Sequence, residues 1–214
     1  SRILPHLRYT YTVNDSIARL YNEEYGTSFF SIRNVPEPRR YPQRDRALLR
    51  RDRHLPADKK IVILQGAGIN IQRGAEEAVL AMQYLENVLL LIVGGGDVMP
   101  VLKALVQEHK LEDKVRFEGK KSPADLAFYT ESADLGLSLD KDTNLNYRYS
   151  LPNKLFDYIH AGIPVLASNL PEVRKIVEQY GIGKIAESHD PEHIAACIRD
   201  LLSDSNDQEA MKYN

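Results

Sequence analysis

The stretch SLPNKLFDYIHAGIPVLAS, residues 150–168, indicates a helix that leads into a short strand. Leu155, Phe156 and Ile159 recur at helical spacing, and Gly162 is a residue type that commonly ends a helix. Residues 163–168 are mostly apolar and predict the strand. This helix and strand form one unit of an alternating pattern that continues on both sides of them.

Strand and helix patterns alternate from residue 60 to residue 202. We expect strands at residues 60–66, 88–93, 114–118, 134–139, 163–168 and 182–186. Helical patterns follow these strands, for example at residues 123–132, where Ser122 suits the N-cap. Six successive βα units predict an α/β fold, a Rossmann-like parallel sheet flanked by helices. Ligands bind beyond the carboxyl ends of the strands in such sheets, so the functional residues should lie in the loops after strands.

The pattern divides the chain into a small first unit, a basic linker, the Rossmann-like domain and a tail, at residues 1–35, 36–59, 60–204 and 205–214. In the first unit we expect a strand at 9–13, a helix at 15–25 capped by Asn14 or Asp15, and a strand at 29–33. The sequence opens in mid-pattern and without Met. We therefore expect a piece of a longer protein, with a truncated tail.

Composition excludes several classes of protein. The net charge of −2 gives no overall attraction to nucleic acid, and the longest apolar run, residues 88–93, is too short to span a bilayer. Cys197 is the single cysteine, so no disulfide framework or cysteine-based metal site can form. The histidines lack metal-ligand spacing, and we expect no metal. A cytoplasmic protein is the expectation.

Residues 37–60 are basic, with nine Lys or Arg against four Asp or Glu. A basic amphipathic segment can attract anionic lipid or nucleic acid. No aromatic residues alternate with the arginines as base stacking would require, so we interpret the segment as a solvated linker and surface helix. A peripheral contact with the inner face of a membrane stays as an alternative, and nucleic acid is not expected as a partner.

The common nucleotide motifs are absent from the sequence. The loop after the first expected strand of the sheet reads Gly66-Ala67-Gly68-Ile69-Asn70-Ile71, and Ile71 occupies the place of the third small residue of a dinucleotide fingerprint. No P-loop and no G-x-S-x-G nucleophile motif occurs. The sequence thus argues against a nicotinamide-dependent oxidoreductase.

The start of the helix in residues 150–168 predicts an anion site. Ser150 and Pro152 suit a helix start, where free N–H groups and the helix dipole attract a phosphate. Lys154 adds a cation, and Asp157 lies one turn further, where it can accept two hydrogen bonds from a ribose diol. A second cation, Arg73, precedes Gly74 in the loop after the first strand of the sheet. The plainer interpretations are a helix cap for Ser150 and solvated surface charges for the others.

Five motifs in order resemble the C-terminal, nucleotide-sugar-binding domain of GT-B fold glycosyltransferases, and most closely glycosyltransferase family 4 (group 1). They are Arg73-Gly74, the strand ending in Gly94-Gly95-Gly96, Val115-Arg116-Phe117-Glu118-Gly119, Ala133-Asp134-Leu135-Gly136-Leu137, and the run from Pro152 to Val165. The resemblance covers residues 60–202. Residues 1–35 resemble the end of the acceptor domain of the same fold.

The resemblance implies the roles of the site residues. Asp157 would bind the ribose, and Arg73-Gly74 the diphosphate. The turn that contains Ser150, Pro152, Asn153 and Lys154 would also bind the diphosphate, and the loop with Phe117 and Gly119 would flank the base. The donor would be a UDP- or GDP-sugar, transferred with retention and without a metal or other cofactor. The acceptor, a sugar or lipid-linked glycan, would bind through the N-terminal domain, and the isolated chain would be inactive.

Two departures from the family pattern affect this interpretation. The first Glu of the family's E-x7-E motif is Tyr149 here, so the sugar-facing carboxylate is missing or displaced to Asp140 or Asp142. A second basic residue, common in the first loop of the family, is replaced near Ala67. A nucleotide-sugar epimerase of the same fold and an inactive nucleotide-binding module are the alternatives, and no catalytic residue can be assigned.

Overall fold

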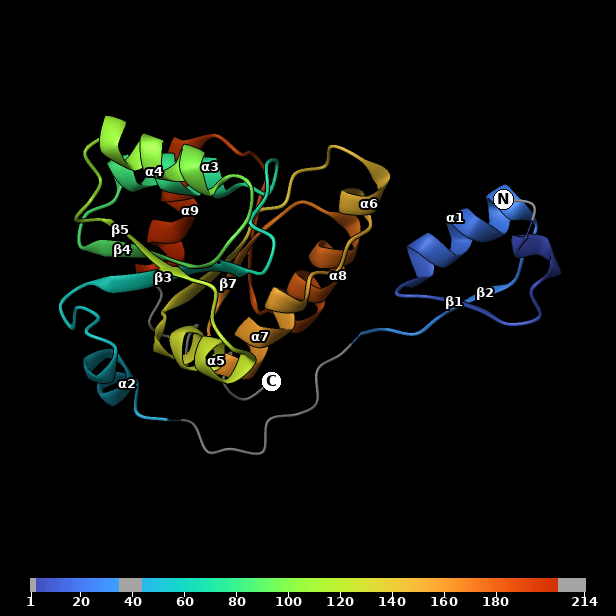
Figure 1. Ribbon diagram of the computed structural model, residues 1–214, viewed down its shortest axis with the longest axis horizontal. Helices are drawn as coiled ribbons and strands as arrows, with labels where there is room; N and C mark the ends of the chain where they lie inside the picture. The colour runs from blue at the N-terminus through green and yellow to red at the C-terminus, as the bar shows by residue number, and fades with distance from the viewer. Residues whose placement is uncertain (1–2, 35–43, 204–214) are drawn as a thin grey trace.

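The computed structural model describes residues 3–34 and 44–203, which form a small N-terminal unit and a larger α/β unit (Figure 1). The tail expected at residues 205–214 and most of the first half of the expected linker lie outside the described residues.

One parallel sheet organises the larger unit. Its strands are β3 (Lys60–Gly66), β4 (Val88–Gly94), β5 (Val115–Gly119), β6 (Leu135–Ser138), β7 (Val165–Ser168) and β8 (Gly183–Ala186). They lie in the order β5-β4-β3-β6-β7-β8, and every neighbouring pair is parallel. The order reverses between β3 and β6, which makes the carboxyl ends of these two strands the switch point. The predicted Rossmann-like sheet is thereby confirmed.

Helices cover both faces of the sheet (Figure 1). One face carries α3 (Ala75–Ala81), the short η2 (Met82–Tyr84), α4 (Met99–Glu108) and α9 (Pro191–Ser203). The other face carries α5 (Pro123–Ser132), α7 (Asn153–Ala161) and α8 (Pro171–Tyr180). Each face has its own apolar core, and β4 is buried along its whole length between them. Burial on both faces explains why this strand reads as a continuous apolar run.

Tyr158 of α7 packs against the middle of the sheet. A Cβ atom at Gly136 would lie 2.4 Å from the Tyr158 ring, so the glycine leaves the space that the ring occupies. The Tyr158 hydroxyl donates a hydrogen bond to the carbonyl oxygen of Leu137 (3.0 Å). Burial raises the pKa of this hydroxyl well above its ordinary value, so it stays a neutral donor. These contacts fix α7 against β6.

The N-terminal unit contains η1 (Leu4–His6), β1 (Thr10–Thr12), α1 (Asp15–Tyr25) and β2 (Phe29–Ser31). Both strands are shorter than expected, and they pair in parallel. Asn14, one of the two candidates, is the N-cap of α1, and its side-chain oxygen accepts a hydrogen bond from the Ile17 amide (2.9 Å). Gly26 ends the helix in the left-handed conformation.

The segment interpreted as a linker contains a helix, α2 (Arg46–Asp52). This helix packs on α5 of the larger unit. Only Leu49 within it is buried, which leaves too little apolar periodicity for a sequence pattern to mark the helix clearly.

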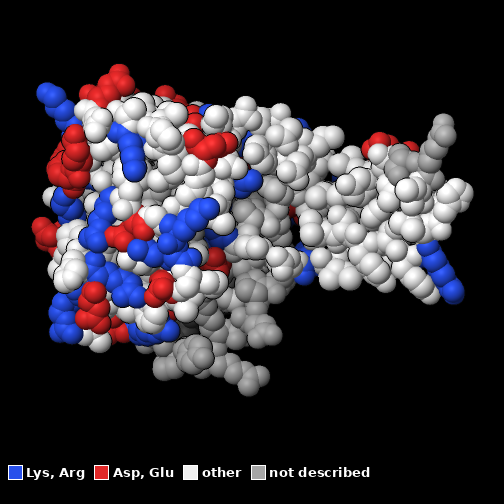
Figure 2. All heavy atoms as spheres, in the orientation of Figure 1, with Lys and Arg blue, Asp and Glu red and all other residues white. Residues whose placement is uncertain are grey.

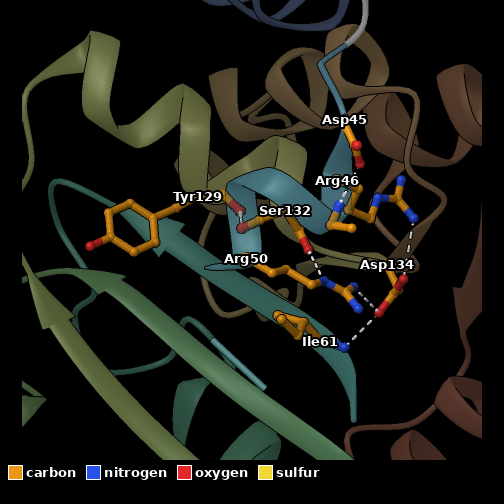
Figure 3. Close-up of polar contacts among 8 residues, drawn as sticks. Asp45, Arg46, Arg50, Ile61, Tyr129, Ser132 and Asp134 are labelled. Carbon is orange, nitrogen blue, oxygen red and sulfur yellow. Dashed lines mark hydrogen bonds and ion pairs between the residues drawn. The ribbon is translucent and has the colours of Figure 1, made fainter. Parts of the chain in front are cut away.

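Asp134 binds α2 to the amino end of the sheet (Figure 3). Arg50 donates hydrogen bonds to the Asp134 carboxylate (2.6 Å) and to the carbonyl of Ser132 (2.9 Å), and Arg46 reaches the other carboxylate oxygen (3.2 Å). The amide of Ile61 donates to the same carboxylate (2.7 Å). The interpretation of a solvated segment is therefore wrong for these two arginines, because a buried carboxylate needs them as partners.

A helix that the sequence did not indicate, α6 (Leu145–Arg148), lies in the loop between β6 and α7. Elsewhere, Lys, Arg, Asp and Glu side chains are interspersed on the face of the larger unit in Figure 2, and no single charge dominates it. Among the described helices, none combines the length and the apolar character that crossing a bilayer requires.

Candidate functional site

A pocket of about 230 Å³ opens at the switch point of the sheet. It lies between the loop after β3 and the first residues of α7. Its lining residues are Leu64, Gln65, Gly66, Ala67, Gly68, Ile69, Arg73, Pro152, Asn153 and Lys154. Four of these, Arg73, Pro152, Asn153 and Lys154, are expected site residues, so the structure brings the two predicted halves of the site together.

Gly74 brings the start of α3 against the end of β6. Its φ is +72°, and a Cβ atom there would lie 2.2 Å from the carbonyl oxygen of Leu139. No other residue type fits this position without a backbone shift. Gly74 thus fixes the backbone next to Arg73, and its contact with a diphosphate stays a prediction.

Arg73 and Lys154 converge on one buried carboxylate. An Arg73 guanidinium nitrogen lies 3.3 Å from Asp140 Oδ1, and Lys154 Nζ lies 3.1 Å from Asp140 Oδ2. The Asp140 side chain is 2% exposed, whereas Arg73 is 33% exposed. The Arg73 guanidinium also lies over the Tyr147 ring, 5.0 Å from its centre. The two cations are therefore held in place beside the pocket before any anion arrives.

The first turn of α7 does not fit the plainer interpretation of Ser150 as a helix cap. Ser150 does not cap the helix, because its hydroxyl donates to the carbonyl of Tyr147 (2.8 Å). Pro152 is the N-cap and provides no side-chain hydrogen bond. The N-cap residue thus leaves the amides at the start of α7 without a capping side chain of its own, which suits an anion at this end of the helix.

Asp157 lies behind the pocket and contacts its wall. Asp157 Oδ2 accepts a hydrogen bond from the Gln65 side-chain amide (3.0 Å), and Gln65 accepts one from the Thr130 hydroxyl (2.7 Å). Gln65 is buried and comes directly before Gly66, the last residue of β3. The expected ribose carboxylate is therefore tied to the pocket by a side chain that the sequence analysis missed.

Phe117 and Gly119 do not line the pocket. Phe117 packs against the core beneath α4, with Lys103 Nζ 6.0 Å from its ring centre. Gly119 ends β5 with a φ of +64°. Burial acts to raise the pKa of Glu118 between them, but hydrogen bonds, first from Tyr129, hold that pKa below its ordinary value. The structure thus gives these residues a role in the end of β5, and a contact with a base stays a prediction.

Both candidates for the displaced sugar-facing carboxylate form ion pairs. Asp140 is held by Arg73 and Lys154, and Asp142 forms an ion pair with Arg148 (3.2 Å). Asp140 lies in the loop after β6, separated from the strand by Leu139. Within residues 3–34 and 44–203, no three His, Cys, Asp or Glu side chains gather closely enough to hold a metal ion.

Comparison with known proteins gives consistent similarities. The family described as "Glycosyl transferases group 1" matches residues 48–214. TuaH of Bacillus subtilis (strain 168), a glycosyltransferase named for teichuronic acid biosynthesis, is 31% identical over 94 residues, which are 44% of this chain and 23% of TuaH.

Solved structures show the same fold. The crystal structure of Anabaena HepE with UDP and glucose has a TM-score of 0.81 and 17% identity, covering 100% of this chain and 58% of HepE. The C-terminal domain of the group 1 protein LpcC from Francisella tularensis has a TM-score of 0.62 and 17% identity, covering 81% of this chain and 90% of that domain. The chain thus spans little more than half of HepE, and its match spans about a quarter of TuaH. These similarities do not favour the epimerase or the inactive module.

Proposed function

Because the chain belongs to the group 1 glycosyl transferases and has the fold of one half of a GT-B enzyme, we propose that it binds the donor, a UDP- or GDP-sugar, for transfer to an acceptor. The observation that carries this proposal is the pocket at the switch point, where Arg73 and Lys154 lie beside the uncapped start of α7. HepE, which shares the fold, binds UDP.

The diphosphate of the donor would lie between the start of α7 and the two cations. As the bond to the sugar breaks, negative charge develops on the departing nucleoside diphosphate. Arg73, Lys154 and the N–H groups of α7 would stabilise that charge, which is the work a metal ion does in other transferases. We therefore propose that the transfer needs no metal ion, because Arg73 and Lys154 already supply positive charge at the pocket.

The ribose would bind at Asp157. Gln65 holds one carboxylate oxygen of Asp157 from the pocket wall, so the orientation of the carboxylate is restricted. A carboxylate in a fixed orientation accepts two adjacent hydroxyl groups with little loss of side-chain entropy. We include transfer with retention, a glycan acceptor bound by a further domain and a cytoplasmic location with a peripheral membrane contact, on the strength of the family alone.

Calorimetry with UDP and with uridine tests this proposal. Arg73→Ala and Lys154→Ala should each weaken UDP binding by roughly ten- to a hundredfold, which corresponds to about 1.5–3 kcal/mol for a hydrogen bond to a charged group. Uridine binding should change little, since the lost contact is to phosphate. Arg148→Ala is the matched control, because Arg148 is a nearby cation that pairs with the exposed Asp142.

Three results would contradict parts of the proposal. Equal losses for UDP and uridine would mean that the cations stabilise the fold and do not bind phosphate. An equal loss in Arg148→Ala would indicate nonspecific attraction of the anion. Loss of UDP binding in EDTA, restored by Mg²⁺ or Mn²⁺, would overturn metal independence.

A further inference from the structure

Three hydrogen bonds connect the N-terminal unit to the side of the larger unit that carries the pocket. Asn14 Nδ2 donates to the carbonyl oxygen of Tyr149 (2.6 Å), and Ser16 Oγ donates to Glu172 Oε1 (2.6 Å). Asn34 Nδ2 donates to Asn153 Oδ1 (3.1 Å). The partners are more than a hundred residues apart in sequence, and two of them, Tyr149 and Asn153, bracket the turn that enters α7.

The Asn14 side chain is fully buried and uses both ends of its amide. Its oxygen caps α1 by accepting from the Ile17 amide, while its nitrogen donates to Tyr149. Rotating the amide by half a turn would place oxygen against the Tyr149 carbonyl and lose both bonds. The cap of α1 and the contact with Tyr149 therefore fix one another.

The Tyr149 carbonyl stands at the point where the chain leaves α6 for α7. Tyr149 is the C-cap of α6, and Asn153, the first residue of α7, follows after three residues. Lys154 comes next and forms the ion pair with Asp140 beside the pocket. A restraint on the Tyr149 carbonyl therefore restrains the entry of α7 and the place of its first cation.

We propose that Asn14 is a positioning residue of the donor pocket, which acts from the N-terminal unit by holding the segment from Tyr149 to Asn153. This inference rests on the proposed function, since the pocket is taken as the donor site. Asn34 restrains the other end of the same segment through its hydrogen bond to Asn153. Ser16 belongs to the same interface but binds α8, through Glu172, and not this segment.

Substitutions at Asn14 can separate its two bonds. Asn14→Ser and Asn14→Asp both keep an oxygen that caps α1, because Ser, Asp and Asn cap helices about equally well. Both remove the amide donor to Tyr149. Asn14→Ser does so without adding charge. Ser16→Ala is the matched control, since it removes a bond of equal length from the same interface.

The affinity of the 214-residue chain for UDP is the first measurement. We expect Asn14→Ser to weaken UDP binding roughly three- to tenfold, the range for one neutral hydrogen bond, and Ser16→Ala to change it less than about twofold. Asn14→Asp should weaken it at least as much as Asn14→Ser, because its buried carboxylate would face the Tyr149 carbonyl. Asn34→Ala, at an exposed position, should have a smaller effect in the same direction and keeps the test valid if the Asn14 variants fold poorly. Unchanged affinity in Asn14→Ser and Asn34→Ala would overturn the inference. So would an equal loss in Ser16→Ala, because the effect would then come from loosening the whole unit.

Hydrogen exchange without ligand separates this inference from the proposed function. The backbone amides of residues 149–151, 153 and 154 should exchange severalfold faster in Asn14→Ser than in the unmodified chain or in Ser16→Ala. If the unmodified chain binds no UDP but this difference is observed, the proposed function fails while the positioning by Asn14 stands. If UDP binds and exchange is the same in all three proteins, the inference fails alone.

Discussion

The two ends of β6 carry the same chemical arrangement for different purposes. Asp134 precedes the strand and Asp140 follows it by one residue, and their residue exposures are 5% and 2%. Each carboxylate lies between two basic side chains, Arg46 and Arg50 at the amino end, Arg73 and Lys154 at the carboxyl end. The two sites differ in what else they contact.

At the amino end, the surrounding protein completes the arrangement. Asp134 also accepts the Ile61 amide, and Arg50 also donates to the Ser132 carbonyl, so the cluster joins α2, β3 and β6. At the carboxyl end, Arg73 and Lys154 line a pocket. The structural cluster and the candidate binding site thus both contain a buried aspartate that is paired with two cations. Arg46 and Arg50 also border a hollow, of about 670 Å³, between α2 and the turn that follows it. What distinguishes the carboxyl-end site is its place at the switch point of the sheet, beside the start of α7.

Asp134→Ala should have the largest effect on stability. It leaves two partly buried arginines and the Ile61 amide without their acceptor, and breaking a buried ion pair from one side costs about 3–5 kcal/mol. Denaturant titration measures the loss. UDP affinity in the folded protein should be unchanged, and a strong loss of affinity would mean that the two ends of the strand are coupled.

Gly74→Ala should follow, because the carboxyl end depends on a close backbone approach. The added Cβ would meet the Leu139 carbonyl, and the positive φ is strained for any residue but glycine. We expect a loss of about 2–3 kcal/mol. Gly119→Ala is the control, since φ there is also positive but no atom lies within 4 Å of the added Cβ. Its cost should be about 1 kcal/mol, and equal costs would show that the approach to Leu139 is unimportant.

Asp140→Asn should destabilise the protein less, by about 1–2 kcal/mol, since Arg73 and Lys154 can be hydrated from the pocket. UDP should bind roughly three- to tenfold tighter at low salt, because a negative charge that competes with phosphate is removed. Asp134→Asn, measured in parallel, should leave UDP affinity unchanged. An equal change of UDP affinity in the two variants would contradict the assignment of the carboxyl end alone to ligand binding.

Tyr158→Phe gives the smallest effect and a baseline for a neutral buried group. It removes the hydroxyl bond to the Leu137 carbonyl but no charge, for an expected loss of about 1 kcal/mol. Thermal or urea unfolding measures it. A loss as large as that of Asp134→Ala would show that charge is not what makes the amino-end cluster strong.

Most of the fold could be predicted because the relevant signals are local. Apolar runs identified the six strands of the main sheet, and Ser122, Asn14 and Gly162 act at helix ends as predicted. A surface helix was expected in the basic segment, but without bounds, and α6 was missed, because seven and four residues are too few to establish a helical period.

The site could be predicted only in part, because its geometry is set by tertiary contacts. Arg73 and Lys154 were assigned to one place, as the pocket shows. Their common partner, Asp140, is 67 residues from Arg73, and no spacing rule connects the two. The caps illustrate the same limit, since the hydroxyl of Ser150 turns back to Tyr147 instead of binding the helix that follows.

The space beside Gly136 has a further consequence, for motion within the sheet. The Tyr158 ring fills the place where any other residue would carry a side chain, so the ring cannot rotate unless β6 and α7 first separate. The rate of ring flipping, which nuclear magnetic resonance can follow through the two edges of the ring, therefore reports how often α7 lifts from the sheet. Since Lys154 stands one helical turn before Tyr158, each such lift of α7 would also disturb the ion pair of Lys154 with Asp140 beside the pocket.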